Sequence, residues 1–343
     1  SLGFQDTDGR VTMGMIVYRL IARKNERQLY PAIPPNWDLA FAKPSQARRV
    51  VLEGVQARRP IYFTPYALSG SAWRNELNGA GTGFRRVSNR TTEAGFDMGY
   101  SPSSNLSLDL TANTDFAQAE ADDQQVNLTR FSLFFPEKRQ FFQERASIFG
   151  FGLGGFSRLF HSRTIGLVNG EPIRILGGAR LVGRAGAWDV GFLDMQTGSR
   201  DSLDSENFGV LRLSRGVFNP YSTVGAMMTS RLTTGGRFNV AAGVDAVVRP
   251  LGDEYFTVKW AQSWSSDLPN SPVGFDQSSA VLRWERRKQT GFSYLGEVVR
   301  QGPGFEPGMG FSFRRDFTSL EALPRYQWLK GAGTRLRAVT LAL

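Results

Sequence analysis

The chain has 343 residues, contains no cysteine and only one histidine, and carries a formal net charge of +10. The lack of cysteine excludes thiol catalysis, disulfides and cysteine-ligated metals, and a single histidine excludes a multi-histidine metal centre. No run of five or six basic residues occurs, so the positive charge is expected on scattered arginines, and neither a nucleic-acid partner nor a cofactor is predicted. No stretch approaches the roughly 18 consecutive apolar residues of a membrane helix.

The first 59 residues differ from the rest. Val11 to Ala22 is a mostly apolar run typical of β-structure, and Pro31, Pro34 and Pro35 then interrupt regular structure. We predict that residues 1–35 are the end of a β-sandwich domain, that 36–59 form a linker, and that 60–343 form a second, larger domain. The chain begins without a signal peptide and ends in a strand-like run, so we expect a fragment truncated at its C-terminus.

From residue 60 onward, apolar and polar residues alternate in short segments separated by turns. In 93–100, Ala94, Phe96, Met98 and Tyr100 alternate with polar residues or glycine. Similar alternation recurs in 105–112, 173–184, 188–192, 237–248, 256–261 and 309–314. A period of two is the pattern of a strand with one apolar face. The sequence therefore predicts an all-β fold with about 12 or 13 antiparallel strands, most near the 9–11 residues that cross a bilayer.

Alternation fits both a soluble sandwich and a transmembrane barrel. In a sandwich the apolar face points inward, whereas in a membrane barrel it meets lipid and the polar face lines the lumen. Long strands and charged residues in the middle of the polar face favour the barrel. Aromatic residues towards the strand ends suit interfacial girdles; they are Trp188, Tyr255, Trp264, Trp284, Tyr326 and Trp328. We expect an incomplete antiparallel transmembrane β-barrel.

One segment resembles a known family. The stretch from Asn113 to Glu144, above all Phe134 to Phe142, is similar to the signature of uncharacterised bacterial envelope proteins. Those proteins pair an N-terminal carbohydrate-binding domain of the family-nine type with a C-terminal outer-membrane barrel. Arg19 to Pro35 looks like the end of the sugar-binding domain, and Val51 to Gly54 with Thr64 to Tyr66 looks like the start of the barrel.

The resemblance implies a Gram-negative outer-membrane location, with the N-terminal part in the periplasm. Its implied partners are outer-membrane lipid and carbohydrate. Most of the sugar-binding domain is missing, so its ligand residues cannot be transferred. The chain also lacks the terminal aromatic residue of outer-membrane barrels, which suggests that further strands are missing. The resemblance gives no mechanism and no oligomeric state.

An acidic cluster follows one predicted strand. Asp115, Glu120, Asp122 and Asp123 are candidate ligand-binding residues, because clustered carboxylates suit hard cations. The alternative is a solvated loop that pairs with nearby basic residues. The spacing matches no calcium-binding loop, and no metal site is predicted.

The segment Phe131 to Phe142 follows, and it contains five phenylalanines. It is too apolar for a free loop, since each large apolar side chain contributes about 1.5–3 kcal/mol when it is buried. We expect it to dock, either in the barrel mouth as a partial plug or as an anchor packed under the strands.

Charged residues on the polar faces are the other candidates. Early strands contribute Glu93, Asp97 and Asp109. Later strands contribute Arg174, Arg180, Arg184, Arg212, Lys259, Arg283 and Arg314, of which the first three are candidate lumen ligand-binding residues. An acidic wall opposite a basic wall would orient dipolar solutes such as sugars. The alternative is that lumen residues only need to be polar.

Ser157 and Ser162 near His161 suggest a serine hydrolase, but a triad also needs an orienting carboxylate and an oxyanion hole. No catalytic residue is predicted. The leading hypothesis is a non-enzymatic outer-membrane barrel with a porin-like or uptake role linked to carbohydrate binding. The alternatives are a non-conducting membrane anchor that presents a binding domain, and an envelope hydrolase acting on lipid or glycoside.

Overall fold

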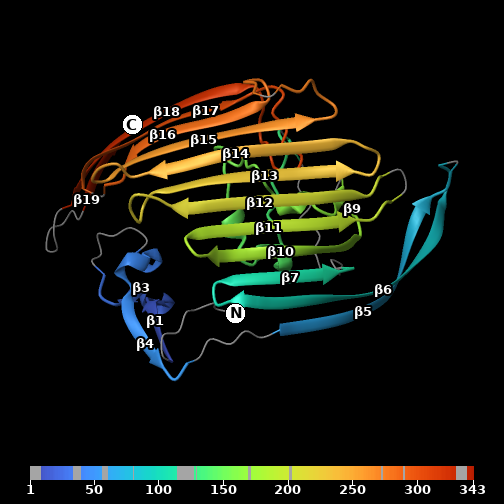
Figure 1. Cartoon of the computed structure of the whole chain (residues 1–343), viewed down its shortest axis with the longest axis horizontal. Helices are drawn as coiled ribbons and strands as arrows, with labels where there is room; N and C mark the ends of the chain where they lie inside the picture. The colour runs from blue at the N-terminus through green and yellow to red at the C-terminus, as the bar shows by residue number, and fades with distance from the viewer. Residues whose placement is uncertain are drawn as a thin grey trace.

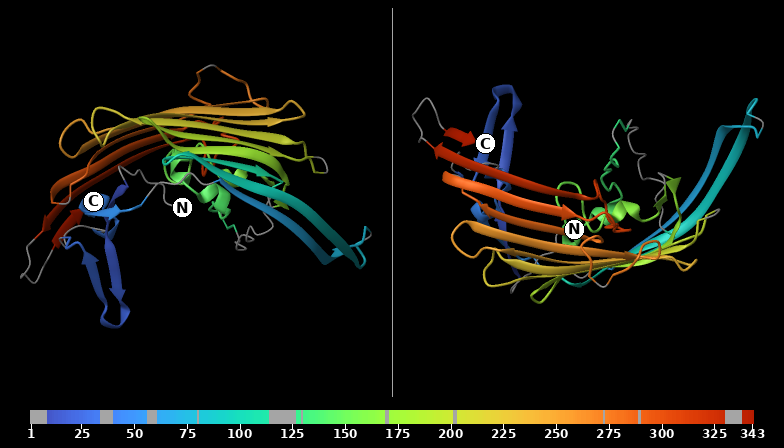
Figure 2. Two further views of the ribbon diagram at one scale, coloured as in Figure 1. Left: turned by 60° about the horizontal axis from the view of Figure 1, so that its bottom comes forward. Right: turned by 90° about the horizontal axis from the view of Figure 1, so that it is seen from above.

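The computed structural model describes residues 9–33, 40–55, 61–79, 81–113, 127–128, 130–168, 171–200, 203–271, 273–288, 290–329 and 338–343. Its main feature is a 13-stranded antiparallel sheet in the order β19-β18-β17-β16-β15-β14-β13-β12-β11-β10-β7-β6-β5 (Figure 1). The all-β prediction and the expected number of strands are therefore confirmed. In the described residues no pairing joins β5 to β19, so the sheet is an open trough (Figure 2).

The strands of this sheet are long, and each pairs with the next along the chain except where β7 meets β10. They are β5 (Ile61–Leu77), β6 (Phe84–Ser103), β7 (Leu106–Ala112), β10 (Ile175–Ala185), β11 (Trp188–Thr197), β12 (Glu206–Gly216), β13 (Thr223–Thr233), β14 (Phe238–Val248), β15 (Glu254–Ser265), β16 (Ser278–Arg286), β17 (Gly291–Gln301), β18 (Phe317–Leu329) and β19 (Ala338–Ala342).

The N-terminal part forms two small sheets. β1 (Arg10–Met15) pairs with β4 (Arg48–Glu53), and β2 (Val17–Ile21) pairs with β3 (Glu26–Tyr30). Short 3-10 turns lie at η1 (Ala22–Lys24), η2 (Ala40–Ala42) and η3 (Pro44–Gln46). Part of the expected linker is thus a paired strand, since β4 carries Val50, Val51 and Leu52 with strong β-propensity. That residues 1–35 belong to a separate domain stays a prediction.

The two faces of the large sheet differ in character, because successive side chains point to opposite sides. On β12, Leu211 lies on the convex face with 43% of its surface exposed, whereas Arg212 lies on the concave face and is 6% exposed. The same alternation places Val244 on the convex face and Asp245 on the concave face of β14. Exposed apolar side chains follow the middle of the convex face from strand to strand; they include Phe192, Leu211, Met228, Val244, Val258, Leu282 and Leu320.

The concave face is covered by two connections that fold back into the trough, seen inside the curve of the sheet in Figure 2. We call the described residues 130–168 the inner segment; it contains α1 (Gln140–Gln143), η4 (Ala146–Phe149), η5 (Ser162–Thr164) and β8 (Leu167–Val168), and β8 pairs with β9 (Glu171–Pro172). We call residues 302–316, between β17 and β18, the inner loop. A strand was predicted over 309–314, and this was wrong: apart from a bridge between Phe311 and Arg158, these residues are irregular.

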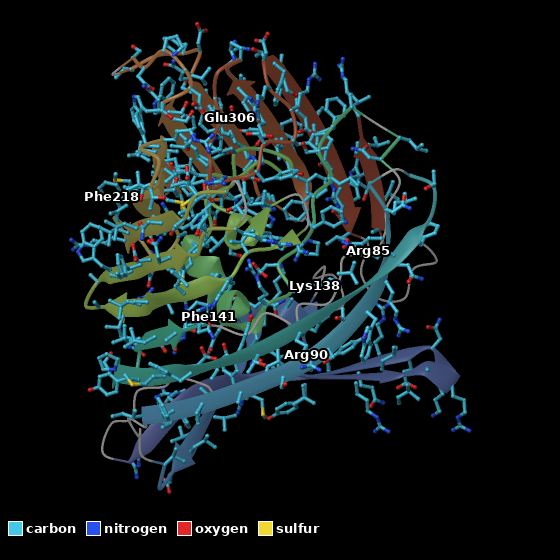
Figure 3. All side chains as sticks on the ribbon, turned by 90° about the vertical axis from the view of Figure 1, so that its right-hand side faces the viewer. Arg85, Arg90, Lys138, Phe141, Phe218 and Glu306 are labelled. Atoms are coloured by element: carbon cyan, nitrogen blue, oxygen red, sulfur yellow. The ribbon has the colours of Figure 1, made fainter. Side chains whose placement is uncertain are left out.

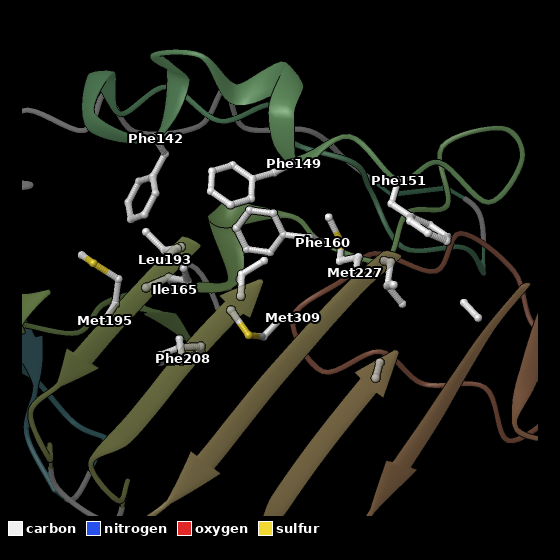
Figure 4. Close-up of a cluster of buried hydrophobic side chains, with 14 of the residues drawn as sticks. Phe142, Phe149, Phe151, Phe160, Ile165, Leu193, Met195, Phe208, Met227 and Met309 are labelled. Atoms are coloured by element: carbon white, nitrogen blue, oxygen red, sulfur yellow. The ribbon is translucent and has the colours of Figure 1, made fainter. Parts of the chain in front are cut away.

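The hydrophobic core lies between the inner segment and the sheet. Rings of Phe142, Phe149 and Phe160 point from the inner segment onto β11 and β12, where they meet Leu193 and Phe208 (Figure 4). Met309 of the inner loop lies in the same cluster. No helix in the described residues is long and apolar enough to cross a membrane.

Candidate functional site

The concave face carries acid–base pairs that lie under the inner segment. Arg212 on β12 contacts Asp245 on β14 through both terminal nitrogens, with side chains 7% and 13% exposed. Arg283 on β16 contacts one carboxylate oxygen of Glu297 on β17 through Nε at 2.7 Å and through Nη2 at 2.5 Å. A buried charge is tolerated only when it is paired. The first pair satisfies that condition across the intervening strand β13, and the second does so between adjacent strands.

Two further residues on the concave face of the sheet, Lys259 and Gly243, lie directly against the inner segment. Lys259 on β15 donates through Nζ to the carbonyl oxygen of Gly152 at 2.9 Å. Both this ammonium and the Arg212 guanidinium lie near the Phe151 ring, 5.9 and 5.4 Å from its centroid. Gly243 faces the same ring, because a Cβ there would lie 2.8 Å from Phe151 Cζ. The inner segment therefore fits the wall closely at this point.

The inner segment is braced internally by Arg139. Its guanidinium donates to both carboxylate oxygens of Glu137 and to the carbonyl oxygens of Ile165 and Ser162. It also lies 4.3 Å from the centroid of the Phe142 ring. Burial alone would raise the pKa of Glu137, but the hydrogen bonds and charge of Arg139 lower it below its ordinary value. Glu137 is therefore ionised and holds the turn in place.

The inner loop joins the inner segment along one edge. The backbone N–H of His161 donates to the carbonyl of Met309 at 2.7 Å, and that of Arg158 donates to Phe311 at 2.8 Å. The amide of Asn239 on β14 donates to the carbonyl of Glu306, and its oxygen accepts from the N–H of Gly308. The inner segment and the inner loop are therefore hydrogen-bonded to each other, and the inner loop is hydrogen-bonded to the sheet.

His161 does not assemble a serine nucleophile. Its Nε2 lies 3.0 Å from the Phe135 carbonyl oxygen, so this nitrogen must carry the proton. Ser162 Oγ donates to Glu137, and Ser157 Oγ accepts from the N–H of Phe313. In the described part of the chain, neither hydroxyl is bonded to the imidazole. Burial, followed by the positive charge of Arg158, lowers the pKa of His161 to about 4, so the ring is neutral at pH 7.

Of the residues predicted as ligand-binding, the structure describes Arg174, Arg180 and Arg184. Asp115, Glu120, Asp122 and Asp123 lie outside the described residues.

The three arginines occupy three different environments. Arg180 is 2% exposed, contacts Asp109 at 3.2 Å and donates to the Phe141 carbonyl. Arg184 lies at the strand end, 60% exposed, and pairs with Asp189. Arg174 precedes β10 and donates to the side chain of Asn113. Arg180 alone contacts the inner segment.

The structure does not separate an acidic wall from a basic wall, because the observed ion pairs bring opposite charges together on adjacent strands or across one intervening strand. Asp109 faces Arg180 in register across β7 and β10. Arg314 lies on the inner loop rather than on a strand. The concave surface is consequently a set of local ion pairs.

Four of the six predicted girdle aromatics lie exposed on the convex face near strand ends; they are Trp188, Trp284, Tyr326 and Trp328. Tyr255 lies on the opposite face, beneath the guanidinium of Arg287 at 4.1 Å. Trp264 is half-buried, and its Nε1 donates to the Ser271 carbonyl at 2.7 Å. Tyr255 and Trp264 lie at odd and even positions of β15 and therefore on opposite faces.

The docking of Phe131 to Phe142 was expected, and the structure places the segment on the concave face (Figure 3). The inner loop was missed. The sequence signal for this loop is its glycine content, because glycines weaken a strand; they are Gly302, Gly304, Gly308 and Gly310. In the structure, a Cβ at Gly310 would lie 2.4 Å from the Arg158 carbonyl oxygen. Among the described residues, no group of three or more metal-ligating side chains is present.

Comparison with known proteins gives one match. Residues 61–175 are similar to a family described as a domain of unknown function (DUF5916). The matched range runs from β5 to the start of β10 and includes the whole inner segment. No curated protein and no solved structure matches the chain.

Proposed function

We propose that this chain is the wall of a bacterial outer-membrane barrel whose lumen is occluded by the inner segment and inner loop, and that it serves solute uptake. The observation that carries the proposal is the inverted polarity of the sheet. Apolar side chains lie exposed on the convex face, while paired charges lie on the concave face. In a membrane barrel the lipid replaces the water that these apolar groups would otherwise contact.

The size of the apolar row supports this proposal over a soluble sandwich. Monomeric soluble proteins rarely expose contiguous apolar patches larger than a few hundred Å². Here exposed apolar positions face one another across strands, as Phe192 with Leu211 and Leu211 with Met228. Further along, Val258 faces Leu282. Charged convex residues such as Arg215, Glu254 and Arg286 lie near the strand ends.

The lengths of the connections support an orientation. At one end of the strands lie the short connections 186–187, 217–222, 249–253 and 287–290. At the other end lie the longest connections, 113–174, 266–277 and 302–316, together with 198–205 and the short connections 78–83 and 234–237. Outer-membrane barrels place short turns in the periplasm and long loops outside. β5 begins at the short-turn end, which would put the N-terminal part in the periplasm, together with the carbohydrate-binding role that its resemblance implies.

The occlusion itself favours a second candidate, a non-conducting anchor. Both occluding connections belong to the long-loop end, and both are fastened to the wall by Lys259 and Asn239. An uptake protein would need to move them, whereas an anchor would not. Single-channel conductance separates the two, because a chain that conducts after the tethers are removed has a lumen that can open.

The membrane proposal is tested by a matched pair of charge substitutions. Ser214 and Asp245 each face Gly225 in register, so Ser214 lies at nearly the same depth as Val244 but on the concave face. Val244→Arg should block assembly into lipid vesicles, because an arginine at the bilayer midplane costs about 2–4 kcal/mol. Ser214→Arg should assemble. Equal assembly of both variants would contradict the proposal.

A further inference from the structure

The inner segment contains a cavity lined by its own residues. It has a volume of about 550 Å³, within the range of small-molecule sites. Its apolar surface includes the rings of Phe134, Phe142, Phe149 and Phe151. Gly155, which also lines the cavity, is exposed. Next to it in the chain, the exposed Phe156 is stacked on the cavity residue Phe134 at 5.6 Å between ring centroids.

One charged group at this cavity is uncompensated. The Arg158 guanidinium lies 4.4 Å from the centroid of Phe134, and its Nε donates to the Phe156 carbonyl at 3.3 Å. Within the described residues, no carboxylate lies at ion-pair distance from it. Its backbone is fixed by exchanged hydrogen bonds with Phe311. Burial lowers the pKa of Arg158, which shows that the cation is partly removed from water without an acidic partner.

The other titratable groups at the cavity do not cancel this charge. Glu137 is held by Arg139 and by the hydroxyl of Ser162. His161 is neutral at pH 7 and donates to a backbone carbonyl. The cavity thus combines an aromatic interior with one fixed cation whose remaining N–H groups are available to a ligand.

We propose that this cavity binds a small organic anion, a carboxylate carried on an aromatic or apolar body, with Arg158 as its counter-ion. A guanidinium binds a carboxylate through parallel charge-assisted hydrogen bonds, which gives both strength and orientation. The rings would bury the body of the ligand. This inference deepens the uptake proposal, on which the position of the cavity inside a lumen rests, by assigning the chemical class of the solute.

Binding is tested with benzoate and its neutral isostere benzamide on the purified full chain in detergent. His161 is the only histidine, so its imidazole NMR signals need no separation from others and report on this cavity. Benzoate should bind at least tenfold more tightly than benzamide and should shift the His161 signals. Acetate, which lacks a ring, should bind more weakly than benzoate.

Arg158→Gln should weaken benzoate binding by about tenfold to a hundredfold, as expected for a charge-assisted pair, and should leave benzamide unaffected. Arg158→Lys keeps the positive charge but lacks the paired N–H donors of the guanidinium, so its loss of benzoate affinity should be intermediate. The control is Arg237→Gln, which removes an exposed arginine outside this cavity and should leave benzoate affinity unchanged.

The inference is overturned if benzoate and benzamide bind equally, if benzoate leaves the His161 signals unmoved, or if Arg158→Gln retains full affinity. The NMR readout on the unsubstituted chain decides the matter even if both variants misfold. Binding in detergent does not depend on conductance, so failure of the uptake proposal and failure of this inference are distinguishable.

Discussion

The guanidinium of Arg180 on β10 lies 3.2 Å from the carboxylate of Asp109 on β7, with the two side chains 2% and 20% exposed. The two residues are 71 positions apart in the sequence, and the inner segment occupies most of the chain between them. Arg180 also donates to the Phe141 carbonyl and lies 5.1 Å from the Phe141 ring centroid. One side chain thus joins both strands to the segment that covers them.

Removing Arg180 should therefore be costly. Arg180→Ala leaves Asp109 without its counter-ion beneath the inner segment, and breaking a buried pair in this way costs about 3–5 kcal/mol. Arg184→Ala is the matched control on the same strand, because Arg184 is 60% exposed and an exposed pair contributes about 0–1 kcal/mol. Urea unfolding in detergent measures both variants. Similar losses of unfolding free energy in the two variants would show that the contacts of Arg180 do not stabilise the fold as described.

Phe142 should control both stability and occlusion. It is 5% exposed and packs in the core between the inner segment and the sheet. Phe142→Ala should destabilise the fold by about 3–5 kcal/mol, as for other buried phenylalanines, and should increase single-channel conductance by loosening the inner segment. Phe218, 90% exposed on the turn 217–222 (Figure 3), is the control and should change neither quantity when replaced by alanine. A destabilised Phe142→Ala variant that never conducts would favour the anchor.

Acid should loosen the inner segment. His161 has an ordinary pKa of 6.5 and a folded-state pKa of about 4, so the unfolded form binds its proton first as the pH falls. Stability is therefore complete above about pH 6.5 and declines between 6.5 and 4, by an amount on the order of 3 kcal/mol. Glu137, whose folded pKa is also lowered, adds a loss in the same direction as it is protonated at lower pH.

Amide hydrogen exchange across residues 134–163 at pH 7 and pH 5, corrected for intrinsic rates, measures this loosening. In His161→Gln the amide can still donate to the Phe135 carbonyl, but the group no longer titrates. Protection in that variant should change less between the two pH values than in the unsubstituted chain. The same pH dependence in both chains would show that His161 is not the responsible group.

The regular strands were predictable because alternation is a local property. On β14, Phe238 and Val244 are exposed on the convex face while Ala241 is fully buried on the other, and the sequence alternates in the same register. The inner loop was not predictable in the same way. Met309, Phe311 and Phe313 alternate like a strand, yet they pack against the inner segment, including Phe131, which stacks on Phe313 at 4.9 Å. That contact joins residues far apart in the chain.

Local irregularity also limited the placement of side chains. A register shift between Ile175 and Gly177 breaks the alternation at the start of β10. Arg174 therefore lies outside the row that contains Arg180. Alternation places Gly243 on the concave face, but a Cβ there would lie 2.8 Å from the Trp260 carbonyl oxygen as well as from the Phe151 ring. A charge at Gly243 should therefore disrupt packing, and Ser214 is the better concave control.

The central claim, that the convex face meets lipid, is tested most directly by spin-label accessibility in reconstituted vesicles. The chain has no cysteine, so Val244→Cys, Val258→Cys and Ser214→Cys each provide a single labelling site. Labels at 244 and 258 should be more accessible to oxygen, which concentrates in the bilayer, than to a water-soluble nickel chelate. The label at 214 should not show this preference. Greater nickel accessibility at both 244 and 258 would contradict the proposal that the convex face meets lipid and would indicate that this face is exposed to water.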